Sequence, residues 1–258
     1  MNALERFKLK VKRGDGPFYG WLRRALKSGL QMNLPVPGLL KPVLRVFYEL
    51  HYVVIVLLRR MLVFFYKEPL FRSRCESVGR NLYLDGPMPF VMGQAEIHIG
   101  NNVKINGALS ILSGRFVDRP KLTIQDRAII GAGTVISVNR EVVIEEDVMV
   151  ATNCRIADND GHPREADLRA QHAPLRDRDM RPVRICRNAW IGNGTQIMKG
   201  VTIGEGAIIG ANSVVISSIP EYCMAMGNPA EIFLRNVGRP KKKAPAEAPA
   251  PEHLMQDS

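Results

Sequence analysis

The chain has 258 residues, of which 46% are hydrophobic, so it is long and apolar enough to bury a core and is not disordered as a whole. Its net charge of +11 is carried by residues 1–80, which hold 16 Lys or Arg and 5 Asp or Glu, whereas residues 81–258 hold 20 of each. The basic end favours an anionic partner, either a membrane surface or a nucleic acid. The four cysteines form no CxxC pair, which excludes a zinc ribbon.

Residues 1–80 are expected to form a basic, amphipathic, helical extension. Segment 42–66 is apolar apart from one helical stripe of polar residues, and its longest charge-free run, 50–58, is far shorter than the roughly 20 residues of a membrane-spanning helix. We expect residues 1–70 to lie on an anionic membrane surface; packing of segment 42–66 on the end of the following domain is the alternative. No nucleic-acid-binding motif accompanies the charge, so no nucleic acid partner is expected.

Residues 1–20 contain charges throughout and no apolar stretch typical of a signal peptide. We therefore expect a cytoplasmic protein, peripheral at the cytoplasmic face of the inner membrane.

A repeat with a period of six residues dominates 81–237. Six successive hexads begin with Ile185, Ile191, Ile197, Ile203, Ile209 and Val215. Three earlier triplets keep the same spacing: Ile99, Ile105, Ile111; Ile124, Ile130, Ile136; and Ile144, Val150, Ile156. Neither the 3.6-residue period of a helix nor the two-residue period of a strand explains this spacing. One short strand and one corner per hexad, with the aliphatic residue inward, predict a mainly β domain built as a parallel β-helix.

Two segments depart from the repeat. Residues 158–182 are polar and contain prolines, and they interrupt the hexads without ending them, so a long loop is expected to project from the β-helix there. Residues 238–258 contain three consecutive lysines followed by Ala, Pro and Glu, a composition typical of a disordered tail.

Several motifs in the repeat resemble one enzyme family. They are the segment 150–163, which runs from Val150 through Asn153 to Gly-His-Pro; the segment 182–192, which ends in Trp-Ile-Gly; the hexads of 200–215; and Gly-Asn-Pro-Ala at 227–230. Together they resemble the hexapeptide-repeat acyltransferases, and within them the sugar O-acetyltransferases that include maltose and galactoside acetyltransferases. The resemblance implies a left-handed β-helix, a homotrimer, and transfer of an acetyl group from acetyl-CoA to a carbohydrate hydroxyl without a metal.

The resemblance also implies roles for individual residues. His162 matches the family's catalytic histidine, and an imidazole is suited to act as a general base on a hydroxyl. Asp158 or Asp160 could hold the other ring nitrogen of His162, and the sequence does not choose between them. Asn153 matches an asparagine that hydrogen-bonds the acceptor.

The cofactor residues are implied in the same way. Trp190 matches a tryptophan near the thiol end of CoA, and a backbone N–H near Gly192 or Asn193 could stabilise the oxyanion. The pantetheine arm is expected along 210–213, which includes Gly210, Ala211 and Ser213. Arg235 could meet a CoA phosphate.

The basic extension suggests an acceptor at the membrane, such as a polysaccharide or lipid-linked glycan precursor. Three alternatives remain at this point. A xenobiotic acetyltransferase would act on a soluble acceptor and leave the extension unexplained. A non-catalytic scaffold of a biosynthetic complex would not need the His162 loop. A γ-class carbonic anhydrase would need three zinc-binding histidines, and only His98, His162 and His172 lie in or near the coils.

Overall fold

The computed structural model describes residues 2–239 except 32, 34 and 115–117, and the chain divides into two compact units, Met1–Arg59 and Arg60–Ser258. The division lies earlier than the boundary after residue 80 that the sequence analysis drew. Of the tail predicted for 238–258, only Gly238 and Arg239 lie within the described residues.

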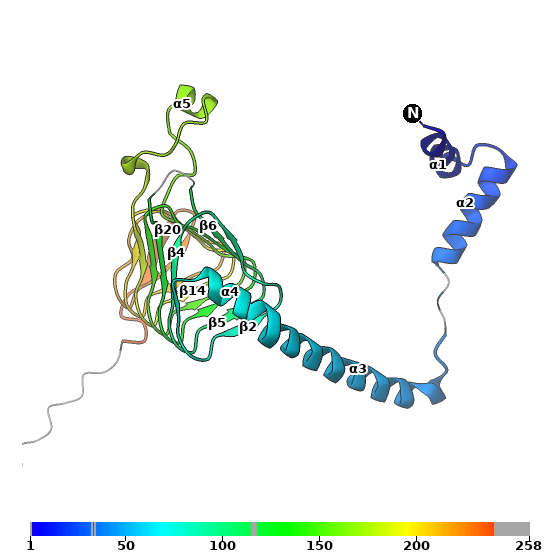
Figure 1. Ribbon diagram of the computed structural model, residues 1–258, viewed down its shortest axis with the longest axis horizontal. Helices are drawn as coiled ribbons and strands as arrows, with labels where there is room; N and C mark the ends of the chain where they lie inside the picture. Colours follow the sequence, from blue (N-terminus) through cyan, green and yellow to red (C-terminus); the bar gives the residue numbers. More distant parts are fainter. Residues whose placement is uncertain (1, 32, 34, 115–117, 240–258) are drawn as a thin grey trace, which may run out of the picture. The chain divides into compact units, whose positions relative to one another are not determined.

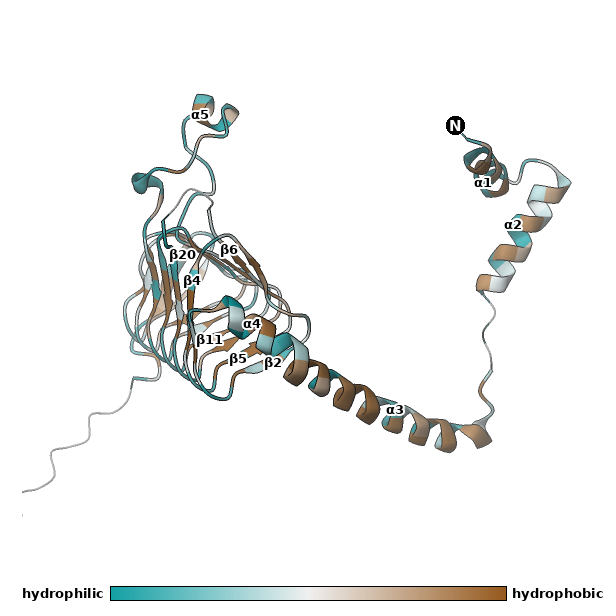
Figure 2. Cartoon of the chain, viewed as in Figure 1, coloured by the Kyte–Doolittle hydropathy of each residue, from teal (hydrophilic) through white to brown (hydrophobic). Residues whose placement is uncertain are grey.

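The first unit is helical. Its elements are α1 (Ala3–Arg13), α2 (Pro17–Leu30), the short 3-10 helix η1 (Gly38–Leu40) and most of α3 (Lys41–Leu62). Asn2 begins α1 with a capping box, in which its side chain accepts the Glu5 N–H at 2.9 Å. None of the residues in α1, α2 or α3 is buried, and the hydrophobic colouring of α3 in Figure 2 extends along most of the helix.

The second unit is a parallel β-helix with three sheets, which we name A, B and C in the order in which the chain visits them in each turn (Figure 1). Sheet A contains β1 (Ser77–Val78), β4 (Glu96–Ile99), β7 (Lys121–Ile124), β10 (Glu141–Ile144), β13 (Val183–Ile185) and β16 (Thr202–Ile203). Sheet B contains β2 (Tyr83–Asp85), β5 (Lys104–Asn106), β8 (Ile129–Ile130), β11 (Met149–Val150), β14 (Trp190–Ile191), β17 (Ile208–Ile209), β19 (Met224–Gly227) and β20 (Ala230–Leu234). Sheet C contains β3 (Phe90–Met92), β6 (Leu109–Leu112), β9 (Thr134–Ser137), β12 (Arg155–Ala157), β15 (Gln196–Ile197) and β18 (Val214–Val215).

The predicted inward positions form the core. The strands of successive turns pair in parallel and in register, so Ile144, Ile185 and Ile203 stack in sheet A. The first residue of each hexad from Ile185 to Val215 has an exposed fraction of 1% or less. Each buried isoleucine contributes roughly 1.5–3 kcal/mol of hydrophobic stabilisation, and the stacked column repeats that gain in every turn. The predicted parallel β-helix is therefore confirmed.

A short helical cap covers the N-terminal end of this core. The π-helical segment η2 (Val63–Lys67) leads into α4 (Glu68–Arg74), whose Phe71 is 2% exposed and belongs to the core cluster. Arg74 donates hydrogen bonds to the carbonyls of Gly93 and Ala95 at 2.7 and 3.2 Å. The end of the β-helix is thus covered by α4 together with Val63, which belongs to segment 42–66, is 8% exposed and is part of the same core cluster. Terminal turns of repeat proteins need such a cap because they have no further repeat to bury their apolar edge.

Replacing Phe71 by alanine is expected to lower the free energy of unfolding of the β-helix by about 3–5 kcal/mol, because the variant leaves a cavity under α4. Phe64 and Phe65 lie four and three residues before α4 and are 67% and 68% exposed, so Phe64→Ala serves as the matched control and is expected to change stability by less than about 0.5 kcal/mol. Urea denaturation followed by circular dichroism measures both. Equal effects of the two variants would contradict the capping role of α4.

Candidate active site

His162 lies in the loop 158–182, which leaves sheet C after β12 and enters sheet A at β13. The loop projects from the coils and contains the short helices α5 (Ala166–Ala170) and η3 (Asp177–Asp179), as Figure 1 shows. The exposed side chain of His162 lines a pocket of about 200 Å³, and His172 and Arg169 line the same pocket. The predicted projecting loop is present, and it brings two of the chain's histidines together.

Asp158 does not orient His162. Its side chain is fully buried, and its carboxylate accepts the backbone N–H groups of Asn139 at 2.8 Å and Arg140 at 2.6 Å and the side-chain amide of Asn159 at 2.8 Å. Burial raises the pKa of the Asp158 carboxyl, although these hydrogen bonds act in the opposite direction. Asp158 therefore fastens the corner at which the loop leaves the β-helix, and its oxygens are already used there.

Asp160 is also engaged elsewhere. Its carboxylate binds the ammonium group of Lys199 at 2.5 Å and the guanidinium group of Arg164 at 3.1 Å. Partial burial works to raise the pKa of Asp160, but the hydrogen bonds from Lys199 and Arg164 outweigh it and the pKa is lowered. Within the part of the chain that the structure describes, no hydrogen bond joins His162 to either carboxylate. The Asp160–Lys199 pair ties the loop to the turn that follows β15.

Replacing Lys199 by methionine is expected to speed proteolytic cleavage in 158–182 by roughly 2- to 10-fold, because the loop loses one of its anchors. The contribution of the pair is present above the ordinary pKa of an aspartate and is lost as the pH falls through the lowered value in the folded protein. Arg187→Met, which removes an exposed pair with Glu205 outside the loop, is the control. Unchanged cleavage of the Lys199 variant at neutral pH would show that the pair does not hold the loop.

Two residues that the sequence analysis did not single out hold the chain on either side of His162. The side-chain oxygen of Asn159 accepts the Gly161 N–H at 3.0 Å. One nitrogen of Arg169 donates to the carbonyls of Pro163 at 3.2 Å and Arg164 at 2.6 Å. The only sequence signal for Asn159 was its place at the start of the loop that interrupts the hexads, and Arg169 gave none, because its contacts depend on how the loop folds back.

The residues expected to meet the acceptor and the cofactor lie elsewhere, at the corner between sheets B and C. Asn153 has a left-handed backbone with φ 58°, and its side-chain oxygen packs against Gly133 of the preceding turn, where a Cβ would lie 2.2 Å away. A Cβ on Gly192 would lie 2.6 Å from the Ala211 nitrogen, so the next turn also needs glycine. The predicted residues that share this corner are Asn153, Gly192, Asn193, Gly210, Ala211 and Ser213.

Two of these residues need correction. The Ser213 hydroxyl is fully buried, donates to the Gly210 carbonyl at 2.7 Å and accepts the Gly227 N–H at 3.1 Å, so this side chain supports the corner and does not face a ligand. The Gly192 N–H donates to the Ile209 carbonyl at 2.8 Å and is occupied by the strand ladder. Among the described residues, the Asn193 N–H has no such backbone acceptor, which leaves Asn193 as the better oxyanion donor of the two.

Trp190 stands on the outer face of sheet B and is 49% exposed. The strand register places it between Met149 of the preceding turn and Ile208 of the following turn, in an apolar outer stripe. Arg235 is exposed and follows β20, the last strand of the same sheet. Sheet B therefore carries the candidate cofactor residues, and the pocket of His162 contains none of them.

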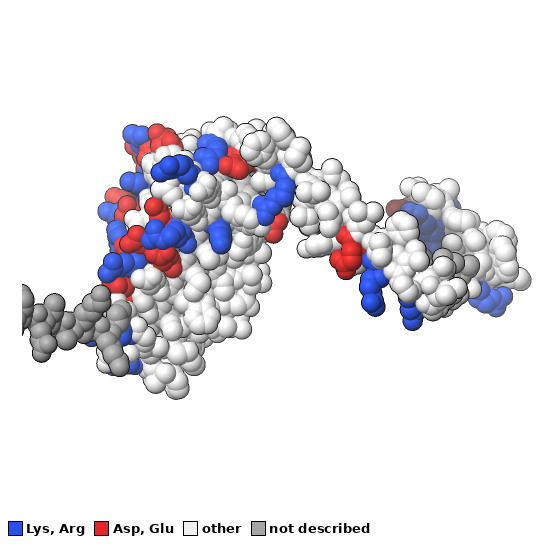
Figure 3. All heavy atoms as spheres, turned by 90° about the horizontal axis from the view of Figure 1, so that it is seen from below, with Lys and Arg blue, Asp and Glu red and all other residues white. Residues whose placement is uncertain are grey.

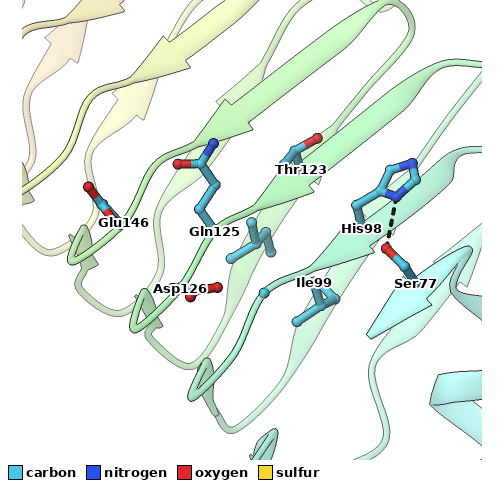
Figure 4. A pocket seen from close by; sticks show the side chains of 9 residues that line it. Ser77, His98, Ile99, Thr123, Gln125, Asp126 and Glu146 are labelled. Atoms are coloured by element: carbon cyan, nitrogen blue, oxygen red, sulfur yellow. Dashed lines mark hydrogen bonds between the residues drawn. The ribbon is translucent and has the colours of Figure 1, made fainter. Parts of the chain in front are cut away.

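A second pocket, of about 310 Å³, lies on the outer face of sheet A (Figure 4). His98 lines it and shares a hydrogen bond of 2.9 Å with the Ser77 hydroxyl. His98 is thus in a different pocket from His162 and His172, so the three histidines that the carbonic anhydrase alternative requires are not brought together.

Comparisons with known proteins identify the same hexapeptide repeat and find acetyltransferases among the similar proteins. The family model described as "Bacterial transferase hexapeptide (six repeats)" matches residues 182–217. The galactoside O-acetyltransferase of Escherichia coli K12 is 31% identical over 167 residues, which are 65% of this chain and 67% of that protein. The polysialic acid O-acetyltransferase of Escherichia coli O1:K1 is 34% identical over 142 residues, or 55% of this chain and 43% of that protein. The chain spans 51% of a longer Mycobacterium tuberculosis relative, Rv3034c, at 28% identity.

Among solved structures, AntD, an N-acyltransferase from Bacillus cereus crystallised with dTDP-4-amino-4,6-dideoxyglucose and coenzyme A, superposes with a TM-score of 0.53 at 22% identity. The match covers 66% of this chain and 88% of that one, and at this identity it establishes the fold. The repeat, the three-sheeted coil and the similarity to galactoside O-acetyltransferase together show that the chain belongs to the hexapeptide-repeat acyltransferases, the enzymes with a left-handed parallel β-helix.

Proposed function

We propose that the protein is an O-acetyltransferase that moves the acetyl group of acetyl-CoA to a hydroxyl of a carbohydrate, with His162 as general base. The observation that carries this proposal is an exposed histidine that lines a pocket, on a loop whose backbone is hydrogen-bonded on either side of that histidine. The relatives named above act on galactosides and polysialic acid, and AntD was crystallised with coenzyme A, which supports both halves of the reaction.

The chemistry requires few groups. A ring nitrogen of His162 takes the proton of the acceptor hydroxyl as the oxygen attacks the thioester carbon. The carbonyl oxygen becomes an oxyanion, for which the Asn193 N–H is the proposed donor. When the carbon–sulfur bond breaks, the protonated His162 returns the proton to the leaving thiolate, so the products are the acetyl ester and free CoA. Acetyl-CoA lies along sheet B in this proposal, with its thiol end at Trp190 and a phosphate at Arg235.

The positions of the proposed residues favour a cyclic homotrimer. His162 belongs to the corner between sheets C and A, whereas Asn153 and Asn193 belong to the corner between sheets B and C. One face, sheet C, separates the two corners. If the sheets C of three subunits face a common axis, the first corner of each subunit meets the second corner of its neighbour, and the closed ring completes three sites.

The first unit supports an acceptor at a membrane. Its exposed apolar side chains include Phe18, Trp21 and Phe47, and they accompany a strong excess of basic residues. By contrast, the face of the β-helix seen in Figure 3 has acidic and basic side chains intermixed beside a broad uncharged area. None of the helices in the described ranges is long and apolar enough to cross a membrane. We propose that residues 1–70 bind an anionic surface peripherally, at the cytoplasmic face of the inner membrane, and bring the site to a lipid-linked glycan or polysaccharide precursor.

Equilibrium binding of acetyl-CoA tests the cofactor half of the proposal. Trp190→Ala is expected to weaken binding by roughly tenfold or more, because the pantetheine arm loses an aromatic contact surface. The chain's other tryptophan, Trp21, lies in α2, and Trp21→Ala is the matched control, with unchanged acetyl-CoA affinity and weaker flotation with anionic vesicles. Unchanged acetyl-CoA binding by the Trp190 variant would contradict the placement of the cofactor along sheet B. Failure of the wild type to float with anionic vesicles would contradict the proposed membrane binding of residues 1–70.

A further inference from the structure

The pocket beside His162 has a pronounced charge asymmetry. His162, His172 and Arg169 line it, and no Asp or Glu is among its lining residues within the described part of the chain. Because an acceptor sugar must bring its hydroxyl to His162, the same pocket has to hold the sugar residue that is modified. We propose that this residue carries a carboxylate, so that the acceptor is an acidic sugar; the inference rests on the proposed function and names its substrate class.

None of the carboxylates of loop 158–182, all of which lie in the described chain, lines the pocket. Asp160 is paired with Lys199 and Arg164, and Glu165 is paired with Arg178. Asp179 is 1% exposed and accepts the Arg176 N–H at 3.1 Å. Asp167 and Asp177 are exposed but do not line the pocket, so an anion that enters it meets Arg169 without a competing carboxylate on the pocket wall.

Arg169 is built to hold such a group. A guanidinium has five N–H donors in a planar fork, and the hydrogen bonds to the Pro163 and Arg164 carbonyls come from a single nitrogen, Nη1. These bonds fix the plane of the guanidinium against the backbone of the His162 loop. In the described chain, Nε and Nη2 make no further hydrogen bond, and this pair of donors suits a bidentate contact with a carboxylate.

The shape of the pocket limits what it takes. Its volume of about 200 Å³ lies below the roughly 300–1,000 Å³ that enclose drug-sized ligands, so it fits one sugar residue of a chain. His172 also lines the pocket: it follows α5 in a left-handed conformation with φ 52°, and its N–H donates to the Arg169 carbonyl at 3.1 Å. The C-terminal end of α5 thus brings a guanidinium and a second imidazole to the same pocket as His162.

Ligand-observed NMR titration of the full-length protein with D-glucuronate and D-glucose tests the inference. The two sugars differ in one carboxylate, so the ratio of their dissociation constants reports on that group. We expect glucuronate to bind at least about tenfold more tightly than glucose at low salt, and the advantage to shrink as salt is added. Arg169→Gln is expected to abolish the advantage, whereas Arg164→Gln, in the same loop but directed to Asp160, is expected to keep it.

The ratio of the two dissociation constants distinguishes a specific carboxylate contact from a general loosening of the loop, and the acidic subsite from the proposed acetyl transfer. A loop loosened by Arg169→Gln would weaken both sugars alike and leave their ratio unchanged, and that result would overturn the role of Arg169. Equal binding of the two sugars by the wild type would overturn the inference while leaving acetyl transfer to neutral sugars possible. Preferential binding of glucuronate without any acetyl transfer to it or to other acidic sugars would support the acidic subsite and count against the proposed function instead.

Discussion

His162→Ala is expected to lower kcat for acetyl transfer by about 10²–10⁴-fold, the range that a positioned general base supplies. The KM for acetyl-CoA should stay within about twofold, because the proposed cofactor residues lie on sheet B and at the corner between sheets B and C, away from the loop. Initial rates of thiol release at saturating acceptor measure both constants.

His172→Ala provides the matched control, since this histidine lies in the same pocket but is not the proposed base. It is expected to change the KM of the acceptor more than kcat. A His172 variant that loses kcat as strongly as the His162 variant, or a His162 variant that retains it, would show that the base has been assigned to the wrong imidazole.

Mixing the impaired variants His162→Ala and Asn153→Ala is expected to raise activity above the mean of the two separate variants. If each site combines His162 of one subunit with Asn153 of its neighbour, random trimers formed from His162→Ala and Asn153→Ala chains contain roughly a quarter of sites with both groups intact. Asn153→Ala alone should lower kcat/KM by about 10- to 100-fold, through loss of a hydrogen bond to the acceptor. Dissociation, remixing and assay of the two variants measure the recovery.

The recovery depends on where the two residues lie. They occupy opposite edges of sheet C in one chain, so a site contained within a single subunit would give no recovery on mixing. Remixed His162→Ala and His172→Ala chains are the control. Both residues line the pocket of the same subunit, so every site in the mixed trimers contains one of the two changes and no activity is recovered. Sedimentation of the wild type should show three chains; a monomer that is fully active would contradict the shared site.

The repeat made the fold predictable in unusual detail. Because each turn must place one aliphatic residue inward at each side, the spacing of Ile185, Ile191 and Ile197 already determined the burial of those positions and the order of the three sheets. The N-terminal cap was not predictable in this way. The role of Phe71 depends on an end of the β-helix that leaves no periodic trace, and the sequence left open whether segment 42–66 packs on that end or lies on a membrane.

The candidate site could be predicted only in part. Resemblance pointed to His162, and the interruption of the hexads marked its loop. The partners of Asp158 and Asp160 could not be predicted, because Asn139 and Lys199 lie about 20 and 40 residues away along the chain and meet these carboxylates only through the stacking of turns. Ser213 was misjudged for a related reason: position five of a hexad points inward, so its hydroxyl is consumed by the corner.

The central claim is that this chain transfers an acetyl group to a sugar oxygen with His162 as base. Acetyl-CoA labelled in its acetyl group, incubated with the full-length protein, neutral and acidic sugars and a membrane extract, tests it most directly, with the sugar fraction analysed by mass spectrometry. The account predicts labelled O-acetyl sugar from the wild type and from Trp21→Ala when a soluble sugar is the acceptor, and a loss of at least about 100-fold with His162→Ala. Label that stays on CoA with every acceptor, in a protein that does not bind acetyl-CoA, would contradict the account and leave a β-helical scaffold in its place.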